Sequence, residues 1–273
     1  MRACPPGTSS RSLVSLVDVL ATVADIVGRP LPAGAGEDRQ EPVRRGRAIL
    51  RVAAVIAATA GVSLAQPAHP ISGRPIAGVM GHQGAAWLER PEREAEEAPR
   101  KAIAELQLRP GQVVADIGAG SGYYTMLLSA AVGPRGRVYA TDIQPEMLAL
   151  IRKKLENTAV PNVELVLGTA TESRLPDAAI DLAVMVDVYH ELAQPQAFLQ
   201  SLRRAIKPDG RLVLIEFRKE DDRVPIRQEH KMTIREARME LEAEGYRFER
   251  VIDVLPWQHI LVFGPGGVRD KRE

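Results

Sequence analysis

Strand-like and helix-like segments alternate along residues 112–263, and this alternation constrains the fold more than any other feature of the chain. Short runs that are apolar on both faces are separated by helical segments, which is the pattern of a parallel sheet covered by helices. Strands are expected at residues 112–117, 137–141, 163–167, 180–186, 211–217, 246–254 and 257–263. Helices are expected at residues 89–106, 124–132, 145–155, 195–206 and 233–244. The last two strands leave no room for a crossover helix, so we expect an antiparallel hairpin at one edge of the sheet.

The composition excludes several classes of protein. With 273 residues, of which 45% are hydrophobic and 26% charged, the chain is long and apolar enough for a globular core. Its net charge of +1 argues against a general nucleic-acid binder, so we expect no nucleic-acid partner. A single cysteine, Cys4, rules out an intrachain disulfide. The spacing of His190, His230 and His259 matches no metal motif, so no metal ion is expected.

The first 93 residues lack the strand–helix pattern. Residues 1–43 hold a short amphipathic stretch and a Pro/Gly-rich linker, and we expect them to lie outside the fold. In residues 44–66, arginines precede an apolar run that ends in Ser63-Leu64-Ala65, which is typical of a signal peptide and too short for a comfortable transmembrane helix. Two interpretations of this segment remain open. It could export the protein or anchor it to a membrane, or it could form a buried or interfacial helix in a cytoplasmic protein. Residues 67–93 are expected to form an irregular connector and a possible lid.

A glycine-rich loop follows the first strand of the main domain. Gly118, Gly120 and Gly122 occupy every second position between an apolar strand and a helix. At the carboxyl end of a parallel strand, such a loop lets the backbone approach a ligand, and the free N–H groups of the helix can bind an anionic group. The nicotinamide fingerprint G-x-G-x-x-G would place Tyr123 at its third glycine, which disfavours a dinucleotide site.

Asp116 followed by these glycines resembles motif I of the class I S-adenosylmethionine-dependent methyltransferases, and the resemblance extends over residues 94–263. It implies a methyltransferase domain at residues 94–264, followed by a polar tail at 265–273. The implied fold is a Rossmann-like, seven-stranded, mostly parallel sheet of order 3-2-1-4-5-7-6, with the last strand antiparallel and helices on both faces. The implied enzyme uses S-adenosylmethionine to methylate a small or medium-sized acceptor. The chain is broadly similar to quinone-biosynthesis C-methyltransferases, and GSGYYT resembles protein isoaspartate methyltransferases, but the substrate and the oligomeric state stay unassigned.

The resemblance also implies a set of cofactor-binding residues. Asp142 ends the second strand, where family members hold both ribose hydroxyls, and a carboxylate can accept two hydrogen bonds from a diol. Asp142 could also cap the next helix. Ile143 would pack on the adenine, and Thr169 stands where many relatives have an adenine-binding aspartate. The full set is Asp116, Gly118, Ala119, Gly120, Gly122, Tyr123, Asp142, Ile143, Thr169 and Asp187.

Polar residues directly after the fourth strand are candidates for acceptor chemistry. If the acceptor must lose a proton, His190 is the first candidate for the base and Glu191 the second, although both could simply begin the next helix. The predicted substrate pocket is formed by Trp87, Tyr189, Arg227 and His230. Aromatic residues make up only 4% of the chain, so Tyr123, Tyr124 and Tyr189 could wall a sulfonium, or Tyr124 could belong to the core.

Two other functions stay open at this point. An NAD(P)-dependent oxidoreductase would also use an acid at the position of Asp142. A noncatalytic exported protein could also retain the methyltransferase fold. Such a protein would no longer meet the cofactor, since the cofactor is made in the cytoplasm.

Overall fold

The computed structural model describes residues 67–158 and 161–266. Our predictions for residues 1–43 and 44–66, for Cys4 and for most of the polar tail lie outside these residues. Within them, no helix is both long enough and apolar enough to cross a membrane.

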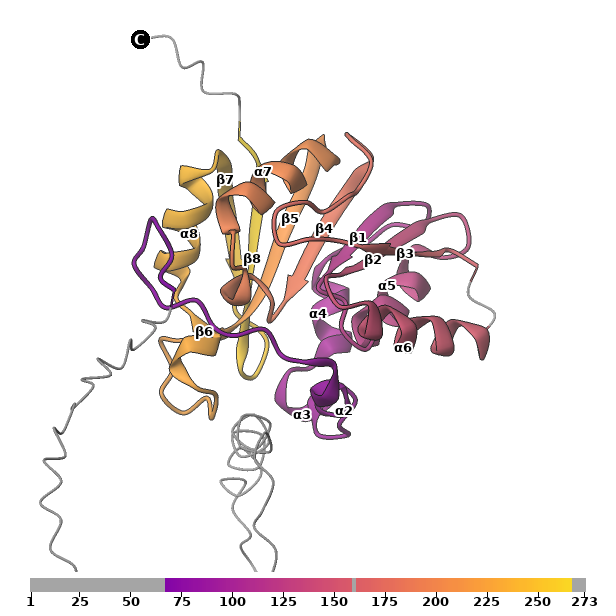
Figure 1. Cartoon of the computed structure of the whole chain (residues 1–273), viewed down its shortest axis with the longest axis horizontal. Helices are drawn as coiled ribbons and strands as arrows, with labels where there is room; N and C mark the ends of the chain where they lie inside the picture. The colour runs from indigo at the N-terminus through magenta and orange to yellow at the C-terminus, as the bar shows by residue number, and fades with distance from the viewer. Residues whose placement is uncertain (1–66, 159–160, 267–273) are drawn as a thin grey trace, which may run out of the picture. The chain divides into compact units, whose positions relative to one another are not determined.

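One twisted sheet organises the domain (Figure 1). Its strands are ordered β3-β2-β1-β4-β5-β8-β7, and the two-residue β6 pairs with β5 near its end. All neighbours run parallel except β8, which is antiparallel to both β5 and β7. The predicted order and the terminal hairpin are therefore confirmed once β6 is set aside. The strands are β1 Val113–Ile117, β2 Arg137–Asp142, β3 Val163–Leu167, β4 Ile180–Val186, β5 Ile206–Arg218, β6 Lys231–Met232, β7 Tyr246–Ile252 and β8 Gln258–Pro265.

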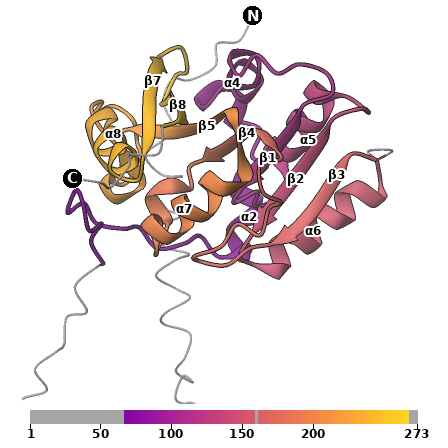
Figure 2. The same cartoon turned by 90° about the horizontal axis from the view of Figure 1, so that it is seen from above.

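Helices cover both faces of the sheet (Figures 1 and 2). Alternate residues of β4 explain this, because Ala183 and Met185 pack with α7 and α8, whereas Leu182 and Val184 pack with α4 and α5. The helices are α2 Ala85–Leu88, α3 Arg93–Glu96, α4 Pro99–Glu105, α5 Tyr123–Val132, α6 Pro145–Glu156, α7 Pro195–Ala205 and α8 Ile234–Ala243. Three 3₁₀ turns complete the elements: η1 His82–Gly84, η2 Tyr189–Glu191 and η3 Gln228–His230.

The single helix expected over residues 89–106 is wrong. The chain forms α3 and α4 instead, with Ala98 between them in a left-handed conformation of φ 51° and ψ 54°. Pro99 is the reason, because a proline disfavours the helical conformation of the residue before it. A second difference concerns β5, which begins at Ile206 rather than residue 211. Ile206 faces Ile180 and Arg211 faces Leu182, so residues 207–210 form a bulge opposite a single residue.

Residues 67–81, which we name the strap, follow a defined irregular path from beside α8, past β6, to α2 (Figure 1). Arg74 binds the buried Glu240 of α8 through two hydrogen bonds, Nε to Oε1 at 2.8 Å and Nη2 to Oε2 at 3.0 Å. The backbone carbonyl of His190 accepts from the Ala77 N–H at 3.1 Å and from Arg74 Nη1 at 3.1 Å. The strap therefore connects α8 to η2 and fixes the chain just beyond β4.

Candidate functional site

The candidate site lies at the carboxyl ends of β1, β2 and β4. Because β1 is flanked by β2 on one side and β4 on the other, the chain leaves these strands in opposite directions and opens a crevice between them. Gly118, Asp142 and Asp187 follow or end the three strands, so the predicted cofactor residues converge at this edge of the sheet.

The glycine loop is approached closely from two directions. Gly118 and Gly120 have left-handed φ values of 67° and 53°, which favour glycine. A Cβ on Gly118 would lie 2.6 Å from Val188 Cγ2, and one on Gly120 would lie 2.7 Å from Leu88 Cδ1. The loop therefore excludes side chains because of packing as well as backbone conformation.

Asp142 connects the glycine loop to the start of α6. Its Oδ2 accepts the Gly120 N–H at 2.9 Å, and its Oδ1 accepts the Gln144 N–H at 2.9 Å. Each carboxylate oxygen keeps a further lone pair, so both can still accept a hydroxyl of a diol. Burial raises the pKa of Asp142 above its usual value despite these N–H bonds. The adjacent Ile143 side chain is 46% exposed, which leaves an apolar surface for a flat ring.

Asp116 links β1 to α5. Its Oδ2 accepts the Thr125 hydroxyl at 2.6 Å, and burial raises the pKa of Asp116 to about 6. The neighbouring Ala119 donates its N–H to the carbonyl of Thr141 at 2.9 Å, which joins the loop to β2. These contacts fix the loop between the first two strands.

Asp187 offers an acceptor with no partner among the described residues. Its Oδ2 accepts from Gln258 Nε2 at 2.7 Å, whereas the enclosed Oδ1 has no hydrogen bond. Burial raises the pKa of Asp187 well above its usual value, and the nearby Glu97 and Glu216 raise it further. Asp187 also has a left-handed φ of 53°, a strained conformation for a non-glycine residue and one found often at binding sites. An enclosed carboxylate oxygen of this kind suits a cationic donor such as an α-ammonium group.

The aromatic residues are divided between two places. Tyr123 and Tyr124 stack with the Arg93 guanidinium, whose carbon is 4.8 Å and 5.2 Å from their ring centroids. Tyr189 is fully buried in the core beside His69, so its predicted place in the substrate pocket stays a prediction. The three rings therefore do not form one aromatic cage.

The position of Thr169 weakens its predicted role. Its hydroxyl oxygen accepts the N–H groups of Thr171 at 3.3 Å and Glu172 at 3.0 Å. Both lone pairs are thus used, whereas an adenine amino group would need an acceptor. Contact with the adenine stays a prediction.

The segment around α2 covers the glycine loop. Ser121 Oγ donates to Glu89 Oε1 at 2.5 Å, and Lys154 Nζ pairs with the same oxygen at 2.5 Å. Trp87, the residue we predicted for a lid, stacks with Arg90 at 3.7 Å. Sequence reasoning therefore indicated the segment but missed Leu88 and Glu89, the residues that contact the loop.

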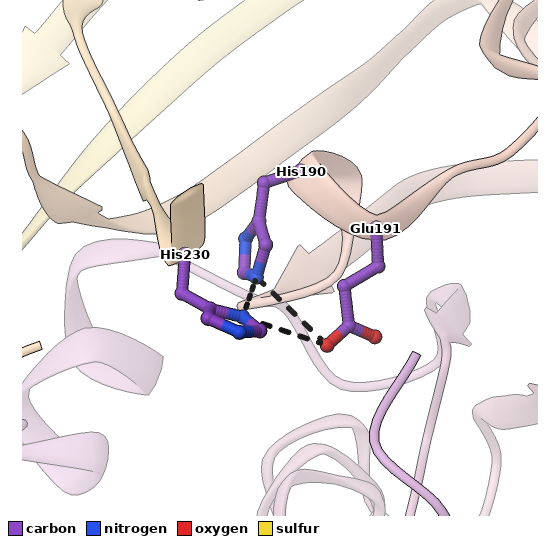
Figure 3. A group of neighbouring side chains, drawn as sticks. All are labelled: His190, Glu191 and His230. Atoms are coloured by element: carbon purple, nitrogen blue, oxygen red, sulfur yellow. Dashed lines mark hydrogen bonds and ion pairs between the residues drawn. The ribbon is translucent and has the colours of Figure 1, made fainter. Parts of the chain in front are cut away.

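A group of three side chains stands beyond β4 (Figure 3). His190 Nε2 lies 3.1 Å from His230 Nδ1, and Glu191 Oε1 lies 3.9 Å from each of these nitrogens. Behind them, His190 Nδ1 hydrogen-bonds to Glu216 Oε2 at 2.6 Å, and Glu216 Oε1 accepts the Tyr189 N–H at 2.9 Å. We name these four side chains, His190, Glu191, Glu216 and His230, the histidine cluster. Sequence reasoning missed Glu216 as a member of this cluster. Arg227, which we predicted for the substrate pocket, pairs with Glu229.

Three residues of the histidine cluster, His190, Glu191 and His230, have shifted pKa values. Burial lowers the pKa of His190, but the Glu216 carboxylate more than offsets this effect and the pKa is raised. Burial raises the pKa of Glu191 to about 7 and, together with His190, lowers the pKa of His230 to about 4. Glu191 and His230 are 14% and 31% exposed, against 2% for His190, so they form the open side.

The fold and motif agree with comparisons to known proteins. The "Methyltransferase domain" family model matches residues 115–214. A crystal structure of a SAM-dependent methyltransferase from Aquifex aeolicus is 31% identical, with a TM-score of 0.65, over 68% of this chain and 100% of that one. This chain belongs to the S-adenosylmethionine-dependent methyltransferases. S-adenosylmethionine is the cofactor of the family, and Asp116, the glycine loop and Asp142 are the residues of this member that fit it.

Other similar proteins match this chain over a smaller part of their own length. The ubiquinone/menaquinone biosynthesis C-methyltransferase UbiE of Cupriavidus metallidurans is 35% identical over 117 residues, which is 43% of this chain and 48% of that protein. The chain thus spans about half the length of this relative. The [4+2]-cyclase SpnF has the same fold, with a TM-score of 0.52 at 15% identity, over 62% of this chain and 80% of its own. The fold alone therefore does not specify an acceptor.

Proposed function

We propose that this chain transfers a methyl group from S-adenosylmethionine to a small or medium-sized acceptor that binds between the glycine loop and the histidine cluster. The arrangement of Asp142 carries the proposal. Its two oxygens hold the loop and the start of α6 through N–H bonds, and both retain lone pairs for the ribose diol.

The other cofactor residues fit the remaining parts of the same molecule. Ile143 offers an exposed apolar surface beside Asp142 for the adenine. Asp187 Oδ1 offers an enclosed acceptor for the α-ammonium group. Leu88 and Glu89 close the loop from the outside and would exclude water from the crevice. When bound, S-adenosylmethionine supplies a methyl group on a positively charged sulfur, which is already activated toward a nucleophile.

The main task of the protein is then to orient the acceptor and exclude water. Where the acceptor must lose a proton, Glu191 and His230 are on the open side of the histidine cluster, while His190 is enclosed and acts through them as a positioning residue. This reverses the order of candidates taken from the sequence, in which His190 came first.

Thermal unfolding with S-adenosylhomocysteine tests the cofactor assignment. At 100 times its dissociation constant, the ligand should stabilise the native state by about 2.7 kcal/mol. Asp142→Ala should remove most of this gain, whereas Asp209→Ala, which changes an exposed aspartate in the β5 bulge, should retain it.

The same assay separates the alternatives. Stabilisation by NADH and not by S-adenosylhomocysteine would overturn the proposal in favour of an oxidoreductase. Stabilisation by S-adenosylhomocysteine without methyl transfer to any of a panel of phenols, quinols, amines and thiols would instead favour the noncatalytic alternative.

A further inference from the structure

The most unusual feature outside the cofactor crevice is the set of ligand atoms in the histidine cluster. His190 Nε2, His230 Nδ1 and Glu191 Oε1 all lie within 4.8 Å of one another (Figure 3). Two imidazoles and one carboxylate are a common ligand set for zinc in catalytic sites and for non-haem iron. We propose that His190, Glu191 and His230 bind one first-row divalent metal ion, with Zn²⁺ as its test probe.

The distances suit such an ion. Ligand atoms about 2.1 Å from a metal are separated by about 3.0 Å at right angles and about 3.4 Å at the tetrahedral angle. The two nitrogens are 3.1 Å apart, which falls within this range. Glu191 Oε1 is 3.9 Å from each nitrogen and must move inward by about half an ångström. Because the Glu191 carboxylate also interacts with the backbone N–H of Met80, this movement must keep or replace that hydrogen bond.

Glu216 prepares His190 to act as a ligand. A carboxylate that accepts the Nδ1 proton of a histidine leaves the Nε2 lone pair directed at the metal, and such partners are a regular part of metal sites. Glu216 is completely buried and its second oxygen is held by the Tyr189 N–H, so its own position is fixed. The strap fixes the other side, because Ala77 and Arg74 both bind the carbonyl of His190.

The charges balance and the open side is in the right place. A divalent cation with two neutral imidazoles and the carboxylates of Glu191 and Glu216 gives a net charge of zero. Three protein ligands leave further coordination positions of the ion for water or an acceptor. His230 is the most exposed of the three ligands, so these positions face the solvent side of the histidine cluster. Val188, two residues before His190, packs against Gly118, and the Asp142 carboxylate acts electrostatically on Glu191, so the histidine cluster lies near the cofactor crevice.

The location gives the ion a role that rests on the proposed function. The ion replaces proton transfer to Glu191 or His230, because their acceptor atoms are then bound to the metal. The ion holds the hydroxyl oxygen of a phenol- or enol-like acceptor and lowers its pKa, so the proton leaves to water. The oxygen then bonds to the methyl carbon as the carbon–sulfur bond breaks, and that electron pair stays on the sulfur. The acceptor class is therefore a molecule with an acidic hydroxyl group.

Metal binding can be tested without any acceptor. The tag-free full chain is stripped with a chelator, dialysed, and titrated with Zn²⁺ against a chromophoric competitor, and bound zinc is measured by elemental analysis. We expect one ion per chain. His230→Ala and Glu191→Gln should each weaken binding at least tenfold, and Glu216→Gln about 10- to 100-fold through His190.

Two variants provide matched controls, and a separate assay isolates the cofactor site. His82→Ala removes a histidine outside the histidine cluster, and Glu229→Gln removes the acid next to His230 that pairs with Arg227. Both should bind zinc like the wild type. Stabilisation by S-adenosylhomocysteine should persist in all five variants, which shows that each is folded and that the cofactor proposal stands independently. Substoichiometric zinc in the wild type, or equal zinc affinity in all variants, would overturn the metal site.

Discussion

The two sides of the crevice are assembled in different ways. On the proposed cofactor side, Asp116, the glycine loop and Asp142 come from two successive strand–loop units, and most of their contacts are to backbone N–H groups. On the proposed acceptor side, the histidine cluster combines residues from η2, β5 and η3, and His190 and His230 are separated by 40 positions. The first side is a local motif, whereas the second joins residues that are far apart in the sequence and is held by the strap through the carbonyl of His190.

The part of the strap around Arg74 should therefore matter for the histidine cluster, and breaking its main ion pair has the largest expected effect. Arg74→Ala leaves the buried Glu240 carboxylate without its guanidinium partner, which should cost about 3–5 kcal/mol in the free energy of unfolding measured with urea. Arg238→Ala, on α8 as Glu240 is, removes a half-exposed ion pair with Glu242 and should lower the free energy of unfolding by less than about 1 kcal/mol. A folded Arg74→Ala protein should retain wild-type affinity for S-adenosylhomocysteine. An equal loss of cofactor affinity would break the comparison.

The buried carboxylate of Asp116 lowers the stability of the fold at neutral pH. Because the pKa of Asp116 is raised from 3.8 to about 6, the native state binds this proton more tightly than the unfolded chain does. Its contribution to stability therefore falls as pH rises between these values. Asp116→Asn should raise the free energy of unfolding on the order of 1–3 kcal/mol at neutral pH, and the gain should vanish near the unperturbed pKa. Urea unfolding at both pH values checks this, and Asp209→Asn serves as the exposed control. An identical gain at both pH values would contradict the protonation argument.

A smaller effect should separate backbone strain from packing in the glycine loop. Gly111 and Gly120 both have positive φ, of 91° and 53°, but nothing lies within 4 Å of a Cβ on Gly111. Gly111→Ala should lower stability by about 1–2 kcal/mol and leave S-adenosylhomocysteine affinity unchanged. Gly120→Ala should lower stability by a similar amount through backbone strain. Because its methyl group also displaces Leu88, it should weaken the affinity for S-adenosylhomocysteine at least tenfold in calorimetric titration. Equal affinities in the two variants would show that the covering segment is irrelevant to binding.

The smallest effect is expected at Thr169. Thr169→Ala removes an acceptor from two N–H groups in an exposed turn, so stability should fall by no more than about 1 kcal/mol. Because its lone pairs are already used, affinity for S-adenosylhomocysteine should change less than twofold, as in the neighbouring Thr171→Ala. A loss greater than fivefold in Thr169→Ala alone would support the adenine contact predicted from the sequence.

The same division explains what the sequence could predict. Apolar periodicity predicted the parallel sheet and its terminal hairpin, and the Asp116–glycine spacing predicted the cofactor side, because these features depend on neighbours in the chain. The break between α3 and α4 was also present in the sequence, since Pro99 should have ended the longer helix.

The histidine cluster could not be predicted in this way. Glu216 sits in an apolar strand and gives only one signal, a charged residue among buried positions, which reveals neither His190 nor His230 as its neighbours. Tyr189 follows a strand tip as pocket residues do, but the strap directs its ring into the core, and no local pattern encodes that contact.

The strap also determines how far the protein can be shortened. The earliest contact described for it is the carbonyl of Pro67, which accepts the Ile76 N–H at 2.7 Å, and Arg74 and Ala77 follow. These contacts all join residues at or after Pro67. A protease that cut between Arg74 and Ala77 would separate the guanidinium from the amide that both donate to the His190 carbonyl, and so would uncouple this carbonyl from one of its two donors.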